Sequence, residues 1–191
     1  MHLSRKIYAV ILLGCALWCT LFWICRTPPM EPLAIARWLA LCTLGCIGIT
    51  AACIDWKSEI LPDILTLWCA IPFVAVVVLL NMLEEYFHGA ANFIPAIGPL
   101  AGSLLGFGLL KPLQLILRRH TGEEQLGSGD VKLMLGLGGL TGPTGVLPTL
   151  FLAILIILVC FKSLRHKRLP FGPSLTTAAI VVVLAELQWP F

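Results

Sequence analysis

The sequence predicts an all-α protein, a polytopic membrane helix bundle of about six to seven transmembrane helices. Of its 191 residues, 59% are hydrophobic and 12% are charged, and the mean hydropathy is +0.95. A soluble domain carries about 25% charged residues, so this composition excludes a water-facing globule. Seven apolar stretches of about 20 residues each would occupy most of the chain and leave no room for a separate soluble domain.

The apolar stretches follow one another along the chain. The first covers residues 7–25, behind Arg5 and Lys6. It is too long for a signal peptide and lacks a small-x-small cleavage site, so we expect a retained helix. We divide the chain into an N-terminal transmembrane helix with a short loop, residues 1–32, and a membrane domain, residues 33–191. The further apolar stretches, of which the fourth in this order is short for a crossing, are at about 33–54, 64–80, 93–117, 131–140, 146–161 and 173–187.

Basic residues predict the orientation in the membrane. Of the 13 Lys and Arg residues, 11 lie in or beside four connections, and only Arg26 and Arg37 lie on the other side. Positively charged connections stay in the cytoplasm. The loop 84–88 has no Lys or Arg and is predicted to be external. The net charge of the chain is only +3 and does not indicate a nucleic-acid partner. The connections predicted to be cytoplasmic are the N-terminus, 55–63, 118–130 and 162–170.

Glycine spacing predicts a helix-packing seam. Twelve of the 17 glycines lie between positions 98 and 145, and Gly98, Gly102 and Gly106 recur every four residues. Small residues at this spacing share one helix face and let two backbones approach closely within a bilayer.

The cysteines and histidines predict no metal site. The eight cysteines form no CxxC pair, and they lie in or at the ends of apolar runs, where cysteine usually acts as a small hydrophobic side chain. The four histidines are scattered without the spacing of metal ligands.

Three aspartates lie at membrane boundaries, where ionisable groups are costly and mark candidate functional sites. Asp63 follows Pro62 and precedes an apolar run, so we interpret it as a helix N-cap. Asp55 follows an apolar run near a helix C-terminus, where the macrodipole disfavours negative charge. Asp130 has two interpretations. It is either a helix N-cap, or part of a functional segment in which Gly127 and Gly129 permit unusual backbone conformations and close approach to an extended peptide.

The predicted topology brings Asp55 and Asp130 to the same cytoplasmic boundary. Two such carboxyl groups can share a proton, one acting as general base on a water and the other as general acid. This chemistry suits peptide hydrolysis and needs neither a metal nor a covalent nucleophile. Ser128 lacks the first glycine of a nucleophile elbow, and the glycines match neither dinucleotide-binding nor P-loop patterns.

The chain resembles the type IV prepilin leader peptidases, the bacterial branch of the GxGD intramembrane aspartyl proteases. The resemblance covers roughly residues 35 to 190. Four blocks carry it in order: Asp55 with Pro62-Asp63, Gly127-Ser128-Gly129-Asp130, Val131-Lys132-Leu133, and Pro170-Phe171-Gly172-Pro173.

The resemblance implies an aspartic endopeptidase of the bacterial inner membrane. Its substrates would be type IV prepilins or pseudopilins, whose basic leader is removed on the cytoplasmic side while the apolar helix that follows enters laterally from the lipid. Residues 33–191 would be the prepilin-peptidase domain, in which Asp55 and Asp130 are the catalytic pair. The residues expected to support them are Pro62, Asp63, Gly127, Gly129 and Lys132.

The resemblance also bears on cofactors. Proteolysis requires none, whereas many family members also N-methylate the new N-terminus with S-adenosylmethionine. Family members typically carry an N-terminal region with two CxxC pairs, which this sequence lacks. We therefore expect no zinc and leave methyl transfer open, along with the oligomeric state.

Two other function classes are alternatives to a peptidase. A small proton-coupled transporter also uses paired carboxylates, but both aspartates are predicted at one interface and no inverted repeat is visible. A non-catalytic assembly factor for a pilus or secretion machine would not need the aspartate pair.

Overall fold

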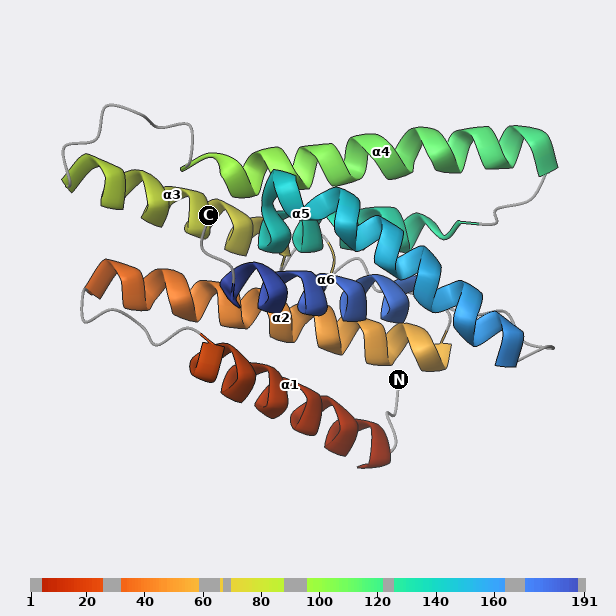
Figure 1. The fold of residues 1–191 in the computed structure, drawn as a ribbon, viewed down its shortest axis with the longest axis horizontal. Coiled ribbons are helices and arrows are strands. Elements are labelled where there is room, and N and C mark those ends of the chain that lie inside the picture. Colours follow the sequence, from red (N-terminus) through yellow and green to blue (C-terminus); the bar gives the residue numbers. More distant parts are fainter. Residues whose placement is uncertain are drawn as a thin grey trace.

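A computed structural model describes residues 5–25, 32–58, 66, 70–87, 96–121, 126–163 and 171–188, and over these residues it contains helices and no β-strand. The predicted all-α class is confirmed. Figure 1 shows the helices packed side by side as an elongated bundle. The six described helices are α1 (Arg5–Cys25), α2 (Pro32–Ser58), α3 (Ala70–Phe87), α4 (Gly98–Thr121), α5 (Ser128–Ser163) and α6 (Phe171–Gln188).

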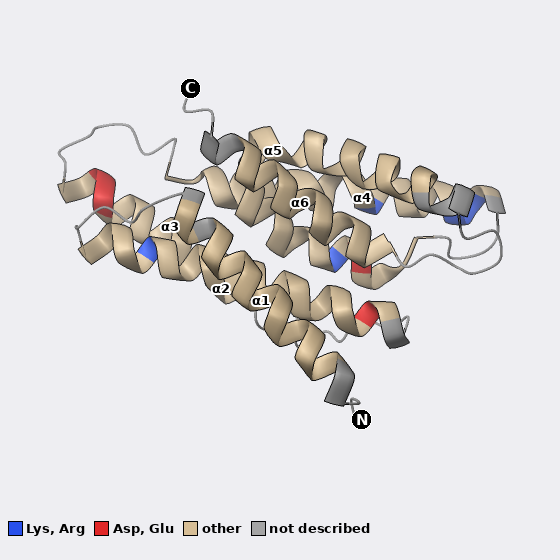
Figure 2. Ribbon diagram, turned by 60° about the horizontal axis from the view of Figure 1, so that its bottom comes forward, with Lys and Arg blue, Asp and Glu red and all other residues tan. Residues whose placement is uncertain are grey.

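Length and composition make this a multi-pass membrane protein. Four helices contain stretches long and apolar enough to cross a bilayer: Pro32–Trp56, Ala70–Phe87, Gly98–His120 and Ser128–Val159. Shorter apolar stretches cover Ile7–Leu21 in α1 and Phe171–Ala185 in α6. Many leucine, isoleucine and valine side chains are exposed on the outside of the bundle, where lipid tails solvate them. Charged residues gather mainly toward the two ends of the bundle (Figure 2).

Helix α5 consists of two arms that reverse direction (Figure 1). The break is at Gly142, whose φ of 68° and ψ of 177° are not helical. A side chain is strained at this φ, so glycine is required there. The predicted stretches 131–140 and 146–161 are thus the two arms of one α-helical hairpin. The seven apolar stretches of the sequence correspond to six helices, one of them bent back on itself.

One end of the bundle, on the right in Figure 1, collects the start of α1, the ends of α2 and α4, both ends of α5 and the start of α6. These are the helix ends that border the four connections predicted to be cytoplasmic. The predicted alternation of crossings therefore agrees with the arrangement of the helices.

The boundaries of α3 differ from the prediction. The helix continues to Phe87 instead of ending near residue 80, so Glu84–Phe87 lie in its last turn and not in a loop. Arg37 of α2 explains the difference, because its guanidinium forms an ion pair with Glu84 and bonds to the side-chain oxygen of Asn81. Hydropathy alone predicts that the helix ends before Glu84, because it takes no account of the ion pair with Arg37 on the neighbouring helix.

The glycine seam predicted on α4 packs against the first arm of α5. A Cβ at Gly102 would overlap the carbonyl oxygen of Gly138, and a Cβ at Gly106 would lie 2.8 Å from Cγ of Met134. The hydroxyl of Ser103 donates to the Leu135 carbonyl oxygen at 2.6 Å. A Cβ at Gly98 would lie at an ordinary contact distance of 3.9 Å from Cδ of Pro143. These contacts fix the position of the arm that carries Asp130.

Helices α1 and α2 pack through a tryptophan and several thiols. The indole of Trp18 covers Gly45, where any Cβ would overlap the ring, and its Nε1 donates to the Cys42 carbonyl oxygen at 3.1 Å. The Sγ atoms of Cys19 and Cys46 lie 3.8 Å apart, and both cysteines are free thiols. Cysteine serves here as a small packing side chain, as the sequence predicts.

We predict that Gly102→Ala weakens the bundle whereas Gly108→Ala, on the same helix, does not. A methyl group at position 102 overlaps the α5 backbone, and overpacking of this kind costs about 1–3 kcal/mol. At position 108 nothing lies within 4 Å of the new Cβ, and alanine favours the helix. Thermal unfolding of the two variants in detergent measures the difference. Equal unfolding midpoints for the two variants would show that close packing at Gly102 does not stabilise the bundle.

Candidate active site

Two buried carboxyl groups meet at the end of the bundle where α2 ends and α5 begins. Asp55 lies in the last turn of α2 with 5% of its surface exposed, and Asp130 lies in the first turn of α5 with 7% exposed. In Figure 2 the acidic positions of these two helices lie close together at that end. Burial of two carboxyl groups in an apolar bundle is costly, which indicates a function.

Gly172, in the first turn of α6, is the point on which the two carboxyl groups converge. A Cβ added there would lie 2.6 Å from Oδ2 of Asp55 and 3.3 Å from Oδ1 of Asp130. Both distances are measured from the same Cβ position, so the two oxygens are at most about 6 Å apart. The carboxyl group of Asp55 can approach the α6 backbone this closely because residue 172 has no side chain.

The first turn of α5 orients Asp130. The helix begins at Ser128, and the Asp130 backbone N–H donates to the carbonyl oxygen of Gly127 at 3.2 Å. Asp130 lies inside the first turn and is therefore not the N-cap residue, but its carboxyl group accepts a hydrogen bond from the Gly127 backbone N–H and so contributes to capping the helix. Its Oδ1, the atom that faces Gly172, is buried and has no hydrogen-bond partner among the described residues. This oxygen points into the site instead of capping the helix.

Gly127 and Gly129 have different roles from those expected. Among the described glycines only Gly142 has a positive φ, so the expectation of unusual backbone conformations at 127 and 129 is wrong. Gly129 is an ordinary helical residue. Gly127 does permit a close approach, because a Cβ there would lie 3.0 Å from Oδ2 of Asp130.

The other expected supporting residues are placed only in part. Lys132 lies on the first arm of α5 and is half-buried. Pro62 and Asp63 lie outside the described residues, so the N-cap interpretation of Asp63 stays a prediction.

Comparison with known protein families matches a segment of the chain that contains both aspartates. Residues 42–162 match the model of the type IV leader peptidase family, and this match includes both Asp55 and Asp130. The chain belongs to the type IV leader peptidase family. The resemblance stated from the sequence motifs is confirmed.

Several relatives of this chain share the name "Prepilin leader peptidase/N-methyltransferase". The protein from Xanthomonas campestris pv. campestris is 31% identical over 73% of this chain and 47% of its own length. That from Neisseria gonorrhoeae is 27% identical over 75% of this chain and 49% of its own length. The chain thus spans about half the length of the curated relatives that it matches. No solved structure matches it.

Gln114 of α4 is a site-supporting residue of this family member that the sequence reasoning missed. Its Nε2 donates to the carbonyl oxygen of Leu126 at 3.1 Å, and its Oε1 accepts from Nζ of Lys111 at 2.9 Å. Gln114 is 5% exposed. The bond to Leu126 attaches the segment before Gly127 to α4 and thereby sets where α5 begins. A polar amide within an apolar helix is the signal that could have identified it.

Gly172 is the second residue that the sequence reasoning did not place in the site. Its motif, Pro170 to Pro173, supported the resemblance, but spacing along the chain does not reveal that α6 starts beside α2 and α5.

In the part of the chain that the structure describes, no three His, Cys, Asp or Glu side chains cluster as metal ligands.

We predict that Gln114→Leu destabilises the protein more than Lys111→Met does. The first substitution leaves the buried Leu126 carbonyl without its donor, which costs about 1–3 kcal/mol. The second removes only the half-buried Lys111–Gln114 hydrogen bond. Thermal unfolding in detergent compares the two variants. A Gln114→Leu midpoint equal to that of the wild type would show that the Leu126 bond does not position α5.

Proposed function

We propose that the protein is an aspartic endopeptidase that removes the basic leader of type IV prepilins or pseudopilins. The observation that carries this proposal is the convergence of Asp55 Oδ2 and Asp130 Oδ1 on the space beside Gly172. Membership of the type IV leader peptidase family supports the reaction class. The relatives named as prepilin leader peptidases support the substrate class.

The carboxyl pair is suited to hold and move one proton. Two buried carboxyl groups within about 6 Å of each other repel when both are ionised, so the resting pair keeps one proton between them. In the proposed reaction, a water molecule reaches the facing oxygens of both groups. Each group is then within reach of the proton that it must take or give.

Peptide hydrolysis follows from this arrangement in two steps. The ionised carboxylate takes a proton from water as the water oxygen bonds to the scissile carbonyl carbon, and the other carboxyl group gives its proton to the carbonyl oxygen. The first carboxyl group then protonates the amide nitrogen while the second takes a hydroxyl proton from the gem-diol. The C–N bond breaks, a carboxylic acid and an amine form, and the pair again holds one proton. Either aspartate can begin as the base.

The position of the pair supports cleavage at the cytoplasmic face of the bacterial inner membrane. Asp55 and Asp130 lie at the bundle end that borders the four connections rich in basic residues (Figure 1). A basic leader remaining in the cytoplasm would reach the pair there. A proton-coupled transporter is disfavoured, because it would expose its carboxyl groups toward both membrane faces, whereas this pair lies at one end.

Methyl transfer is not supported by the described residues. S-adenosylmethionine carries a sulfonium, an ammonium and a carboxylate, which need charged or polar partners. The large cavity beside the aspartates is lined by Ile7, Val10, Ile49, Ala52, Cys53, Trp56, Pro173, Thr176, Thr177 and Ile180. None of these lining side chains carries a charge, whereas relatives of this chain are named as N-methyltransferases, so methyl transfer stays open. Proteolysis by the carboxyl pair requires no cofactor.

We predict that Asp55→Asn and Asp130→Asn each lower leader cleavage by at least about 10³-fold, because each removes one member of the proton-transfer pair. Asp63→Asn retains cleavage, since Asp63 is expected to support the site and not to react. Purified variants incubated with a prepilin and followed by mass spectrometry measure this. Normal processing by both Asp55→Asn and Asp130→Asn would refute the proposed function.

We predict that Gly172→Ala folds but cleaves about 10²-fold more slowly, since displacement of reacting groups by about 1 Å has this effect. The added methyl group would lie 2.6 Å from Oδ2 of Asp55, so it displaces this carboxyl group from the space that the pair shares. Gly108→Ala, which meets open space on α4, is the matched control with normal kcat. A Gly172→Ala variant with wild-type kcat would show that the reaction does not use this space.

A further inference from the structure

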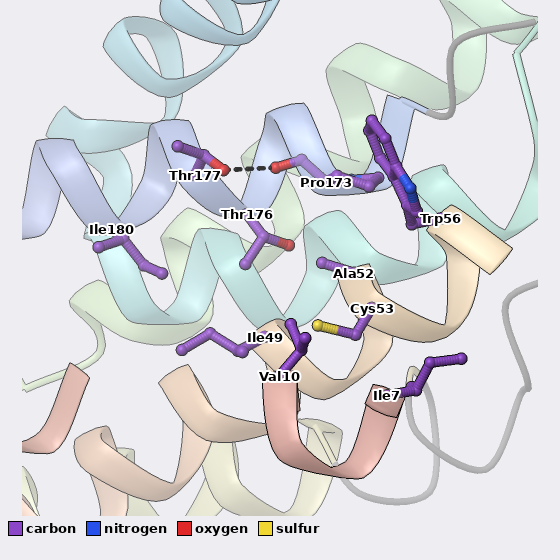
Figure 3. A pocket seen from close by; sticks show the side chains of 10 residues that line it. All are labelled: Ile7, Val10, Ile49, Ala52, Cys53, Trp56, Pro173, Thr176, Thr177 and Ile180. Atoms are coloured by element: carbon purple, nitrogen blue, oxygen red, sulfur yellow. Dashed lines mark hydrogen bonds between the residues drawn. The ribbon is translucent and has the colours of Figure 1, made fainter. Parts of the chain in front are cut away.

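An apolar groove of about 780 Å³ opens beside the aspartate pair. Side chains of α1, α2 and α6 line it (Figure 3). Within the lining, α2 contributes residues from Ile49 to Trp56 and α6 contributes residues from Pro173 to Ile180. Each of these spans covers seven residue steps, which is two helical turns or about 10 Å along the helix axis.

The groove lies next to the candidate active site, although Asp55, Asp130 and Gly172 are not among its lining residues. Trp56 directly follows Asp55, and Pro173 directly follows Gly172, the residue that both carboxyl groups face. Ala52 lies one turn before Asp55 on the same face of α2. Because α2 ends where α6 begins, the other limits of the groove, Ile49 and Ile180, lie deeper in the bundle. The groove therefore extends from the bundle end that holds the carboxyl pair toward the middle of the bundle.

The chemistry of the groove selects its occupant. Its two threonine hydroxyls bond within the protein, Thr176 to the Gly48 carbonyl oxygen at 3.4 Å and Thr177 to the Pro173 carbonyl oxygen at 2.8 Å. An extended peptide in this position would lack polar partners for its backbone. An α-helix satisfies its own backbone hydrogen bonds and needs only apolar contacts. The groove thus suits an apolar helix.

We propose that this groove binds the first two turns of the substrate's apolar helix, immediately after the scissile bond. The inference rests on the proposed function, which requires the scissile bond to lie at Asp55 and Asp130. It also assigns a role to α1, which precedes the family match at residues 42–162 and supplies Ile7 and Val10 to the groove. Helix α1 is thereby part of the substrate-binding site.

The test uses Thr177→Trp, because Thr177 is exposed and lines the groove. Leu104→Trp on α4, where the leucine is 60% exposed and remote from the groove, is the matched control. Each variant of the full chain, in detergent micelles, receives two substrates. One is a complete prepilin, and the other is a soluble peptide that spans the cleavage site and stops before the apolar helix.

We expect Thr177→Trp to raise KM for the complete prepilin by about tenfold or more and to cleave the short peptide as the wild type does. Leu104→Trp cleaves both substrates normally. Wild-type KM for the prepilin in Thr177→Trp would overturn the groove proposal and leave the proposed function intact. If the wild type cleaved neither the complete prepilin nor the short peptide, the proposed function itself would be refuted.

Photo-cross-linking gives a second readout that does not depend on turnover. A benzophenone amino acid replaces Thr177, or Leu104 as control, in the Asp130→Asn background in lipid nanodiscs. We expect a cross-link from position 177 to the first residues of the prepilin's apolar helix and none from position 104. Cross-linking from position 177 to lipid alone would identify the groove as a lipid site and overturn the proposal.

Discussion

The burial of two neighbouring carboxyl groups in an apolar bundle constrains the rest of this structure. Asp55 and Asp130 are held with their facing oxygens no more than about 6 Å apart, and each is almost fully removed from solvent. Such an arrangement persists only where the packing of the surrounding helices offsets the cost of removing these groups from water. The features described above can be understood as parts of that support.

The support comes mainly from small residues and a few polar bonds. On α4, Gly102 and Gly106 allow the first arm of α5 to approach closely, and Gln114 attaches the segment before that arm. On α6, Gly172 leaves room for both carboxyl groups, and Thr176 bonds to the α2 backbone at Gly48. In a bilayer, helices associate through close packing and hydrogen bonds because lipid is as apolar as the side chains. The site therefore depends on backbone proximity more than on large side chains.

Much of this structure follows from the sequence, and the exceptions share a physical cause. Hydropathy predicts the helices because the bilayer sets their length, and ionisable groups at membrane depth identify Asp55 and Asp130. The missed features depend on contacts between distant segments. The extension of α3 requires Arg37 to neutralise Glu84, the position of α5 requires Gln114, and the room beside the carboxyl groups requires Gly172 of α6. Local patterns carry no information about such contacts.

The place of Gly172 in the chain has a consequence for biosynthesis. A ribosome produces α2 and α5 before α6, so both aspartates are made before the helix that completes their surroundings. Until α6 inserts, neither the close approach of Gly172 nor the α6 side of the groove exists. The surroundings of the two carboxyl groups are thus completed only when the last described helix enters the membrane.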